Sequence, residues 1–275
     1  MRKAAALALS THPGPAVAVT AIAVVLGFGV GLEWWRLLLL GLAFLSNQAS
    51  VGLSNDWIDA DRDRAVGRPD KPVAAGRISA TTVRTTAFVT AALAIALTVP
   101  LGWGATAAHA AFIISAWSYN AGLKGTVLSV LPYIVSFGLL PLVVALSRPE
   151  PALASPWAML AGALLGVAAH FANVLPDLED DRATGVRGLA HRAGPRTTGL
   201  VIAGALAGAS LSVVLGLGDA QAYGWTGLAL SLALAVLCAA LVIAGRSTRL
   251  VFRLIIAGAV VDVVLLALSG GRILA

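Results

Sequence analysis

A long apolar run ends in the acidic stretch Asn55-Asp56-Trp57-Ile58-Asp59-Ala60-Asp61-Arg62-Asp63. Within this stretch, Asn55, Asp59 and Asp63 are spaced by four residues. On a helix, a spacing of four places side chains on one face, one turn apart. The stretch therefore predicts a helix that ends an apolar segment and presents one amide and two carboxylates on the same side.

A second stretch repeats this spacing about 120 residues later. Asn173, Asp177 and Asp181 are again spaced by four, and they again follow an apolar run. Nine of the thirteen acidic residues lie in or beside the two stretches. These nine are Asp56, Asp59, Asp61, Asp63, Asp70, Asp177, Glu179, Asp180 and Asp181. The chain has few carboxylates and gathers them in two places, which predicts two acidic sites.

The composition is that of an integral membrane protein. Hydrophobic residues make up 59% of the 275 residues and charged residues 12%, whereas soluble domains carry roughly 25% charged residues. The mean hydropathy is +0.89. The net charge of +6 is better explained by membrane topology than by nucleic-acid binding, because Lys and Arg stay on the cytoplasmic side of a bilayer. The single cysteine, Cys238, excludes an intramolecular disulfide.

A transmembrane helix needs about 20 apolar residues. By this criterion, residues 1–275 form one all-α domain with nine transmembrane helices and a cytoplasmic N-terminus. The predicted spans are 15–32, 35–54, 82–102, 105–122, 127–147, 156–175, 196–216, 222–244 and 250–269. With this topology, sixteen of the nineteen basic residues lie inside, and only Arg36, Arg148 and Arg272 lie outside. The predicted location is a cell membrane, and the bias towards Ala, Gly, Val, Leu and Arg favours a bacterial source.

Both acidic stretches fall on the cytoplasmic side, after the second and the sixth predicted span. We expect a helix–loop unit used twice, with its two acidic sites facing each other. A transporter or cation carrier would instead place its binding acids near mid-membrane. Only Asp262, about 13 Å along its helix from Arg253, is predicted at that depth. The position of the acids therefore disfavours a carrier.

Clustered carboxylates stay ionised only when cations neutralise them. Mg²⁺ is usually bound by one or two carboxylates together with substrate phosphates. Two facing clusters would therefore hold a diphosphate through bridging Mg²⁺ ions. Basic residues of the same segments fit this ligand: Arg64, Arg68, Lys71, Arg77, Lys124, Arg182, Arg187 and Arg192.

The rest of the predicted bundle offers almost no polar surface, so the ligand should carry a long apolar tail. Tyr119 and Asn120, at the end of the fourth span, could lie under the polar site or anchor the helix at the interface. Asp262 is a functional candidate because acids inside a membrane are costly. It either makes a structural hydrogen bond or lines the substrate cavity.

At this point the residues resemble the UbiA superfamily of intramembrane prenyltransferases, over the whole chain. Asn55-Asp56 with Asp59 and Asp63 is similar to the family's first aspartate-rich motif, and residues 67–79 are similar to the segment after it. Asp177 and Asp181, continuing through Gly185, Arg187, Leu189 and Gly194, resemble the second motif. Tyr119-Asn120 and Lys124 resemble the tyrosine and lysine that follow the family's fourth helix.

The resemblance implies a helical bundle around a central cavity that opens to lipid. It implies Mg²⁺-dependent ionisation of an isoprenyl diphosphate and attack on the allylic cation by a hydrophobic acceptor. The implied metal ligands are Asn55, Asp56, Asp59, Asp63, Asp177, Asp180 and Asp181. The implied catalytic residues are Asp59, Asp63, Asp177, Asp181, Lys124 and Tyr119. The implied substrate contacts are Asn55, Arg68, Lys71, Asn120, Asn173, Arg187 and Asp262.

The acceptor stays open. Asn173 stands where many members have Asp. In this respect the chain is similar to members that act on dihydroxynaphthoate, which have Asn at this place. The Arg-Pro segment after the first motif is more similar to members that prenylate glycerol lipids, chlorophyllide or homogentisate. A terpene cyclase on the same scaffold, which would use the prenyl diphosphate alone, is the alternative. The sequence assigns neither the chain length of the prenyl group nor an oligomeric state.

Overall fold

The structure is a computed structural model that describes residues 3–175, 185, 187–218, 222–244 and 248–275. Over these ranges the chain is helical, and its one pair of bridged extended residues is Ala154 with Leu274. The long helices are α2 (Pro13–Gly29), α3 (Trp34–Ile58), α5 (Ala80–Thr98), α6 (Trp103–Ala121), α7 (Leu131–Leu146), α8 (Pro156–Val174), α10 (Leu189–Gly216), α11 (Ala222–Ile243) and α12 (Thr248–Leu268). Shorter elements are α1 (Lys3–Ser10), α4 (Ala60–Ala65), and the 3-10 turns η1 (Val99–Leu101), η2 (Leu123–Gly125) and η4 (Gly270–Ile273).

Each of the nine predicted spans overlaps one of the long helices in these ranges. By length and hydropathy, five of the described helices could cross a membrane alone, and α1 with α2 would be a sixth across a 56° bend. Over the described residues, the structure thus confirms an all-helical fold with several candidate membrane-spanning helices. That all nine cross, with the N-terminus in the cytoplasm, stays a prediction.

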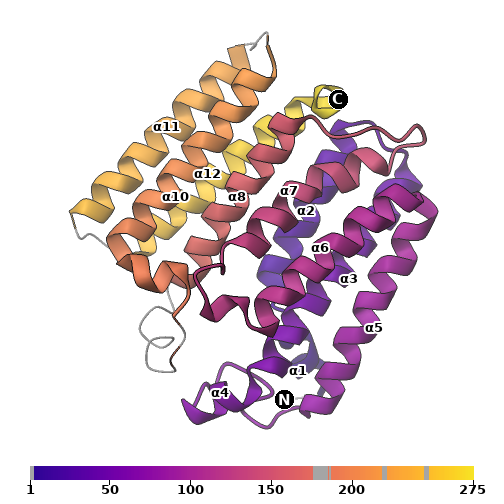
Figure 1. Cartoon of the computed structure of the whole chain (residues 1–275), viewed down its shortest axis with the longest axis vertical. Helices are drawn as coiled ribbons and strands as arrows, with labels where there is room; N and C mark the ends of the chain where they lie inside the picture. Colours follow the sequence, from indigo (N-terminus) through magenta and orange to yellow (C-terminus); the bar gives the residue numbers. More distant parts are fainter. Residues whose placement is uncertain (1–2, 176–184, 186, 219–221, 245–247) are drawn as a thin grey trace.

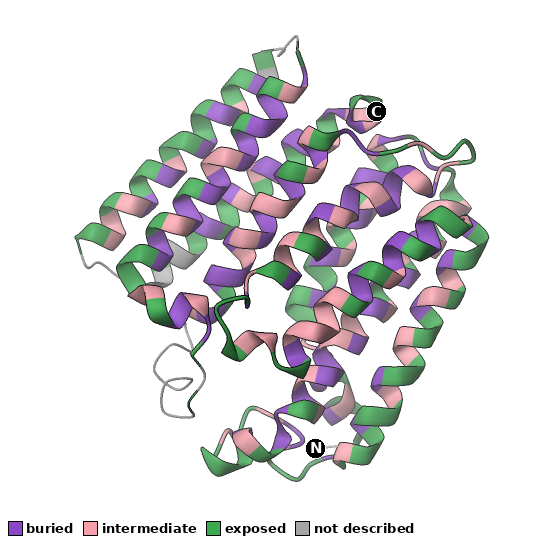
Figure 2. Cartoon of the chain, viewed as in Figure 1, coloured by how far each residue is buried: buried purple, intermediate pink, exposed green. Residues whose placement is uncertain are grey.

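Figure 1 shows the helices standing side by side in one bundle. Helices α10, α11 and α12 stand beside α8, and α2 to α7 form the other part. The N-terminus, α1 and α4 lie at one end of the bundle, and the C-terminus lies at the opposite end. Buried residues follow the helix faces that look into the bundle, while exposed residues cover the outer faces, as on α5 and α11 (Figure 2).

Small residues let α7 and α8 pack closely. A Cβ atom at Gly162 would lie 2.4 Å from the carbonyl oxygen of Phe137, and one at Gly166 would lie 2.4 Å from that of Tyr133. Gly162 and Gly166 form the Gly-x-x-x-Gly spacing that brings membrane helices together. The close contact fixes the part of α7 that carries Tyr133 and Phe137, two residues that line the cavity described below.

The acidic stretch does not continue as one uninterrupted helix. Helix α3 ends at Ile58, Asp59 lies in the turn, and α4 begins at Ala60. The backbone of Asp59 stays near helical values (φ −86°, ψ −1°), and the amide of Asp63 still donates to the carbonyl of Asp59 at 2.8 Å. Asn55, Asp59 and Asp63 therefore still lie one helical turn apart on the same side of the chain, despite the break between α3 and α4.

Candidate active site

A cavity of about 630 Å³ lies inside the bundle, between α2, α3, α6, α7, α8 and α12. One part of its wall is polar and carries Asn55, Asp59, Arg62, Asp63, Arg68, Asp70, Lys71, Tyr119, Asn120, Lys124, Asn173 and His191. Another part is apolar and includes Phe112, Phe137, Leu165, Ile255, Ile256 and Val263. The cavity can therefore hold a molecule with a charged head and an apolar tail.

Asp59 lies at the centre of the polar wall and is 5% exposed. Its Oδ2 accepts hydrogen bonds from Asn55 Nδ2 at 3.0 Å and from Arg62 Nη2 at 3.0 Å. Its Oδ1 accepts a hydrogen bond from Lys124 Nζ. One buried carboxylate thus joins two cations and the amide that precedes it by one helical turn.

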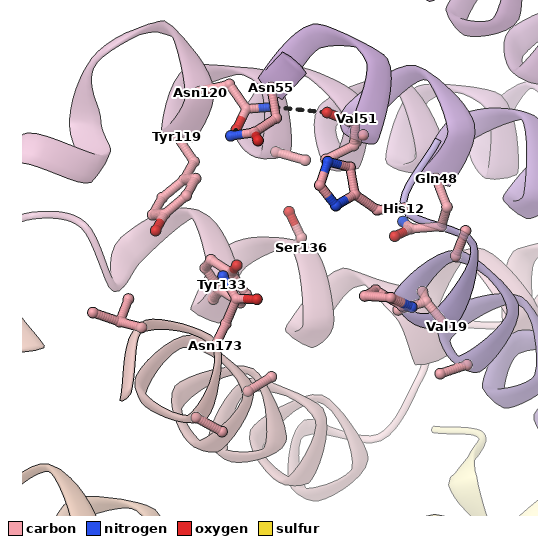
Figure 3. A pocket seen from close by; sticks show the side chains of 18 of the residues that line it. His12, Val19, Gln48, Val51, Asn55, Tyr119, Asn120, Tyr133, Ser136 and Asn173 are labelled. Carbon is pink, nitrogen blue, oxygen red and sulfur yellow. Dashed lines mark hydrogen bonds between the residues drawn. The ribbon is translucent and has the colours of Figure 1, made fainter. Parts of the chain in front are cut away.

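Asn120 fixes the position of α6 against α3. Its Nδ2 donates to the carbonyl of Val51 at 2.9 Å and to Ser54 Oγ at 2.7 Å, and the first of these bonds is drawn in Figure 3. Lys124 follows Asn120 by four residues, in η2, and this docking brings its ammonium group to Asp59. In the view of Figure 3, Tyr119 and His12 lie on opposite sides of the pocket, with Asn55 and Asn120 above and Asn173 below.

Burial shifts the pKa values of two groups at this wall. Burial raises the pKa of the Asp63 carboxyl above its usual 3.8, the charge of Asp59 adds to the rise, and Lys71 opposes it. Burial also lowers the pKa of the Lys124 ammonium below its usual 10.5, while the charge of Asp59 works in the opposite direction. Both groups thus favour their neutral forms more than free side chains do.

Two further cations are held by carboxylates. Arg68 makes a two-pronged hydrogen bond to Asp70, with Nε–Oδ1 at 3.0 Å and Nη2–Oδ2 at 2.9 Å, and this bond lowers the pKa of Asp70. Lys71 Nζ lies 2.8 Å from Asp56 Oδ1 and 3.1 Å from Asn55 Oδ1. His12, from the corner between α1 and α2, joins this group with its Nε2 2.9 Å from Asp56 Oδ1.

Aromatic rings form the neighbouring wall, where α6 and α7 meet. The rings of Tyr119 and Tyr133 pack edge to face with centroids 5.2 Å apart, and both residues line the cavity. The ring of His170, on α8, packs against both tyrosines, and its Nε2 lies 3.2 Å from Ser129 Oγ. This aromatic group is joined to the polar wall because Tyr119 precedes Asn120 on α6.

The structure brings most of the predicted site residues of the first motif to one cavity. Asn55, Asp59, Asp63, Arg68, Lys71, Tyr119, Asn120, Lys124 and Asn173 all line it. Asp56 is buried beside the cavity and Arg187 is exposed, and neither belongs to its lining. Asp262 is buried between helices, where its Oδ1 accepts a hydrogen bond from Ser210 of α10, and it lies outside the lining as well. Asp177, Asp180 and Asp181 lie outside the described residues.

Six polar lining residues were not singled out by the sequence: Thr11, His12, Gln48, Tyr133, Ser136 and His191. They come from the α1–α2 corner and from three helices, α3, α7 and α10, without a shared spacing. Only the packing of these elements brings them together. Gln48 offers the nearest signal, since it precedes Asn55 by seven residues and so lies two helical turns away on the same face.

The side chains of the first motif are of the chemical type that binds Mg²⁺. Asn55, Asp59 and Asp63 offer oxygen atoms only, which are the ligands that this hard cation prefers. Within the described ranges, no three His, Cys, Asp or Glu side chains are close enough to form a metal site by themselves. The first motif therefore supplies a partial set, which ligand phosphates or further acids would have to complete.

The sequence pattern of the UbiA prenyltransferase family matches residues 16–262. Digeranylgeranylglyceryl phosphate synthase from Methanopyrus kandleri is 30% identical over 138 residues, an alignment that spans 49% of each protein. The fold is similar to a UbiA homologue from Archaeoglobus fulgidus bound to GPP and Mg²⁺, with a TM-score of 0.75, 17% identity, and coverage of 96% of this chain and 99% of that one. It is also similar to an apo UbiA homologue from Aeropyrum pernix K1, with a TM-score of 0.74, 18% identity, and coverage of 90% and 95%.

Proposed function

The chain belongs to the UbiA prenyltransferase family, and from this premise we propose that it transfers an isoprenyl group from an isoprenyl diphosphate to a hydrophobic acceptor inside the membrane. The transfer depends on Mg²⁺ and passes through an allylic cation. Long apolar helices and the family make the chain a multi-pass membrane protein. The active site opens towards the cytoplasm in this proposal.

One observation carries the proposal: a single cavity holds the acid–amide cluster and four basic side chains on one part of its wall and apolar side chains on another. An isoprenyl diphosphate has the same division into charged head and apolar tail. A soluble phosphoester would leave the apolar wall empty. A lipid without a phosphate would make no use of the four basic side chains of the polar wall.

The residues of this chain divide the reaction between them. Asn55, Asp59 and Asp63 would hold Mg²⁺, together with Asp177 and Asp181. Bound Mg²⁺ would neutralise the charge that develops on the departing diphosphate. Lys71, Arg68 and Lys124 would donate hydrogen bonds to the diphosphate oxygens. The bond between C1 of the isoprenyl group and the diphosphate oxygen breaks, and its electron pair leaves with the diphosphate.

The allylic cation then lies against aromatic and apolar side chains. The faces of Tyr119 and Tyr133 attract a cation, an interaction worth roughly 2 kcal/mol when it is shielded from water. Phe112 and Phe137 belong to the lining that surrounds the tail and excludes water. The acceptor forms the new bond to C1 and then releases one proton to the surrounding polar groups.

A glycerol lipid is the first acceptor to test, because the relative from Methanopyrus kandleri is named for a glyceryl phosphate product. Aromatic acceptors are the second class. A cyclase reaction, in which a double bond of the prenyl chain itself attacks the cation, would need no acceptor.

The experiment incubates purified protein in nanodiscs with Mg²⁺ and isoprenyl diphosphates of increasing length, with and without acceptors. We expect diphosphate release and a prenylated product only when an acceptor is present, and no turnover in excess EDTA. Asp59→Asn should lower turnover roughly 100-fold or more, which is the scale for removing one charged group aimed at the reacting centre.

Asp61→Asn is the matched control in the same motif. The Asp61 side chain is 97% exposed and pairs with Arg64, so its replacement should leave turnover unchanged. Full activity of Asp59→Asn would overturn the proposal. A cyclised product without any acceptor would replace it with the cyclase reaction.

A further inference from the structure

Asp56 does not line the cavity with Asp59 and Asp63. It follows Asn55 by one residue, so its side chain is turned about 100° around the helix from that of Asn55. Asn55, Asp59 and Asp63 line the cavity, whereas Asp56 does not and is 2% exposed. The carboxylate of Asp56 is thus set apart from the cavity wall to which Asp59 belongs.

The carboxylate of Asp56 has its own partners. Its Oδ1 contacts both Lys71 Nζ, at 2.8 Å, and His12 Nε2, at 2.9 Å. Its Oδ2 is buried, with no hydrogen-bond partner among the described residues. Lys71 and His12 both line the cavity. Asp56 therefore reaches the cavity only through the two side chains that it holds.

Lys71 keeps a donor for a ligand in this arrangement. An ammonium group has three N–H donors. The contacts with Asp56 Oδ1 and Asn55 Oδ1 use two of them. We assign the proton of His12 to Nε2, which then donates to Asp56, so that the contact of Nε2 with Lys71 at 3.2 Å uses no lysine donor. The third N–H of Lys71 is left for an anion.

His12 is placed by a fixed corner of the backbone. It is the one described residue other than glycine with a left-handed backbone (φ 53°, ψ 65°). The preceding residue, Thr11, lies so close to α3 that a Cβ atom at Gly52 would be 2.4 Å from its carbonyl oxygen. Ser10, at the end of α1, is fully buried. The α1–α2 corner thus holds the His12 ring in contact with Asp56 and Lys71.

We propose that Asp56 and His12 are positioning residues that hold Lys71 for a phosphate of the substrate, and that Asp56 is not a ligand of Mg²⁺. This inference rests on the proposed function, because it takes an isoprenyl diphosphate as the ligand of the cavity. It gives the N-terminal corner a part in substrate binding. It also divides the acids of the first motif by role: Asp59 and Asp63 bind Mg²⁺, and Asp56 positions the ammonium group of Lys71.

The test separates metal binding from phosphate binding. Geranyl thiolodiphosphate, an unreactive substrate analogue, is titrated into the purified protein with Mg²⁺ by calorimetry. Bound Mn²⁺ is counted in parallel by electron paramagnetic resonance, with the analogue at saturation. The variants are Asp56→Asn and His12→Asn, with Asp59→Asn as the metal-ligand reference and Asp61→Asn as the neutral control. Asparagine at position 12 is too short to reach Asp56 and tolerates the left-handed backbone.

We expect Asp56→Asn and His12→Asn to weaken analogue binding about tenfold or more, since the first removes the charge that holds Lys71 and the second removes the contact that holds Asp56. Both should bind as much Mn²⁺ as the wild type, whereas Asp59→Asn should bind less. In a Lys71→Met background, Asp56→Asn should cause no further loss, because it acts through Lys71. If the role of Asp56 were merely structural, Asp56→Asn would still weaken analogue binding in the Lys71→Met background.

Two results would overturn the inference: loss of Mn²⁺ in Asp56→Asn to the extent seen in Asp59→Asn, or unchanged analogue binding in His12→Asn and Asp56→Asn. His12→Asn decides the question if Asp56→Asn does not fold. A wild-type protein that binds neither the analogue nor Mn²⁺ would remove the proposed function itself, together with the role of Asp56. Normal wild-type binding with unaltered variants would remove only that role.

Discussion

At the residue scale, the polar wall holds an acid and a base that both resist ionisation. Burial raises the pKa of Asp63 and lowers the pKa of Lys124. The two groups have opposite charges, and each lies close to Asp59, which supplies a fixed negative charge between them. A dication that entered beside Asp63 would replace the proton of its carboxyl group.

Mg²⁺ binding should therefore depend on pH through Asp63. Below its raised pKa, the Asp63 proton competes with the metal, and above it the carboxylate is ready to bind. The Mg²⁺ concentration that gives half-maximal activity should fall as pH rises through a window above the ordinary aspartate pKa of 3.8, and then level off.

The measurement is a series of Mg²⁺ titrations of activity at increasing pH, starting near the ordinary aspartate pKa of 3.8. Asp63→Asn should weaken Mg²⁺ binding and abolish the dependence on pH. A Mg²⁺ requirement that does not change with pH in the wild type would contradict this account of Asp63.

Residues of the first site could be predicted from the sequence where the chain itself sets their spacing. Asn55, Asp59 and Asp63 follow a helical repeat, and the predicted cations lie within a few residues of the acids or of a helix end. His12 and Tyr133 could not be predicted in this way. Their neighbours in space lie 44 and 14 residues away in the chain, Asp56 for His12 and Tyr119 for Tyr133, and only packing brings them together.

At the scale of elements, the start of α10 is packed against the turn that carries Lys124. A Cβ atom at Gly188 would lie 2.4 Å from the carbonyl oxygen of Lys124 and 3.0 Å from Ser129 Oγ. Ser129 Oγ also accepts a hydrogen bond from the amide of Leu189 at 3.0 Å. This contact joins the segment that follows the second motif to Lys124, which binds Asp59 of the first motif.

Gly188→Ala should displace Lys124 and lower activity about tenfold, the effect of weakening one charge-assisted contact. The backbone of Gly188 (φ −65°, ψ 178°) suits alanine. The effect would therefore come only from the steric clash of the new methyl group with the carbonyl oxygen of Lys124. Gly125→Ala is the control in the same turn, since a Cβ atom there meets nothing within 4 Å. Steady-state activity and melting temperature of both variants check this, and equal activities would contradict the packing role.

The contact between α7 and α8 gives a prediction on stability. Gly166→Ala would push a methyl group against the carbonyl of Tyr133, so the helices must separate. We expect a loss of about 1–3 kcal/mol, the usual cost of overpacking, and a lower melting temperature in detergent. Gly204→Ala on α10, where a Cβ atom meets nothing within 4 Å, should melt like the wild type. An unchanged melting temperature for Gly166→Ala would show that the helices can move apart freely.

The long helices were predictable because each one contains an apolar run of the right length. The short ones were not, because neither α1 nor α4 has such a run. The spacing of the acidic stretch predicts one helix, whereas the structure ends α3 at Ile58 and begins α4 at Ala60. The turn at Asp59 and the corner at His12 arise from contacts with α3, α6 and the segment around Lys71, which the sequence of either element does not contain.

At the scale of the whole molecule, charge is distributed unequally between the two ends of the bundle. The end with the N-terminus carries α4 and the first motif, and the opposite end carries the C-terminus and the loop between α7 and α8 (Figure 1). This loop, around Glu150, holds few charges, and the last residues of the chain are bonded to it through Ala275 N and Leu153 O at 2.9 Å. The end with the first motif should face the cytoplasm.

Labelling of single cysteines tests this orientation. In a Cys238→Ser background, cysteine is introduced at the exposed positions Asp61 and Glu150, at opposite ends of the bundle. A maleimide that does not cross membranes should label position 150 in intact cells, and position 61 only after the cells are opened. The reverse pattern would invert the topology, and labelling of both positions in intact cells would contradict an odd number of crossings between them.

In the described part of the structure, the cations around Asp59 are neutralised by the protein's own acid: Lys124 and Arg62 both bind this one carboxylate. A diphosphate can recruit these cations only if Asp59 gives them up, and Asp59 can release them at low cost only if a metal takes their place. Substrate binding then becomes an exchange of ionic partners, and by linkage each ligand tightens the binding of the other to the same extent. The protein would hold neither Mg²⁺ nor diphosphate firmly alone, so its site would fill only when both are present.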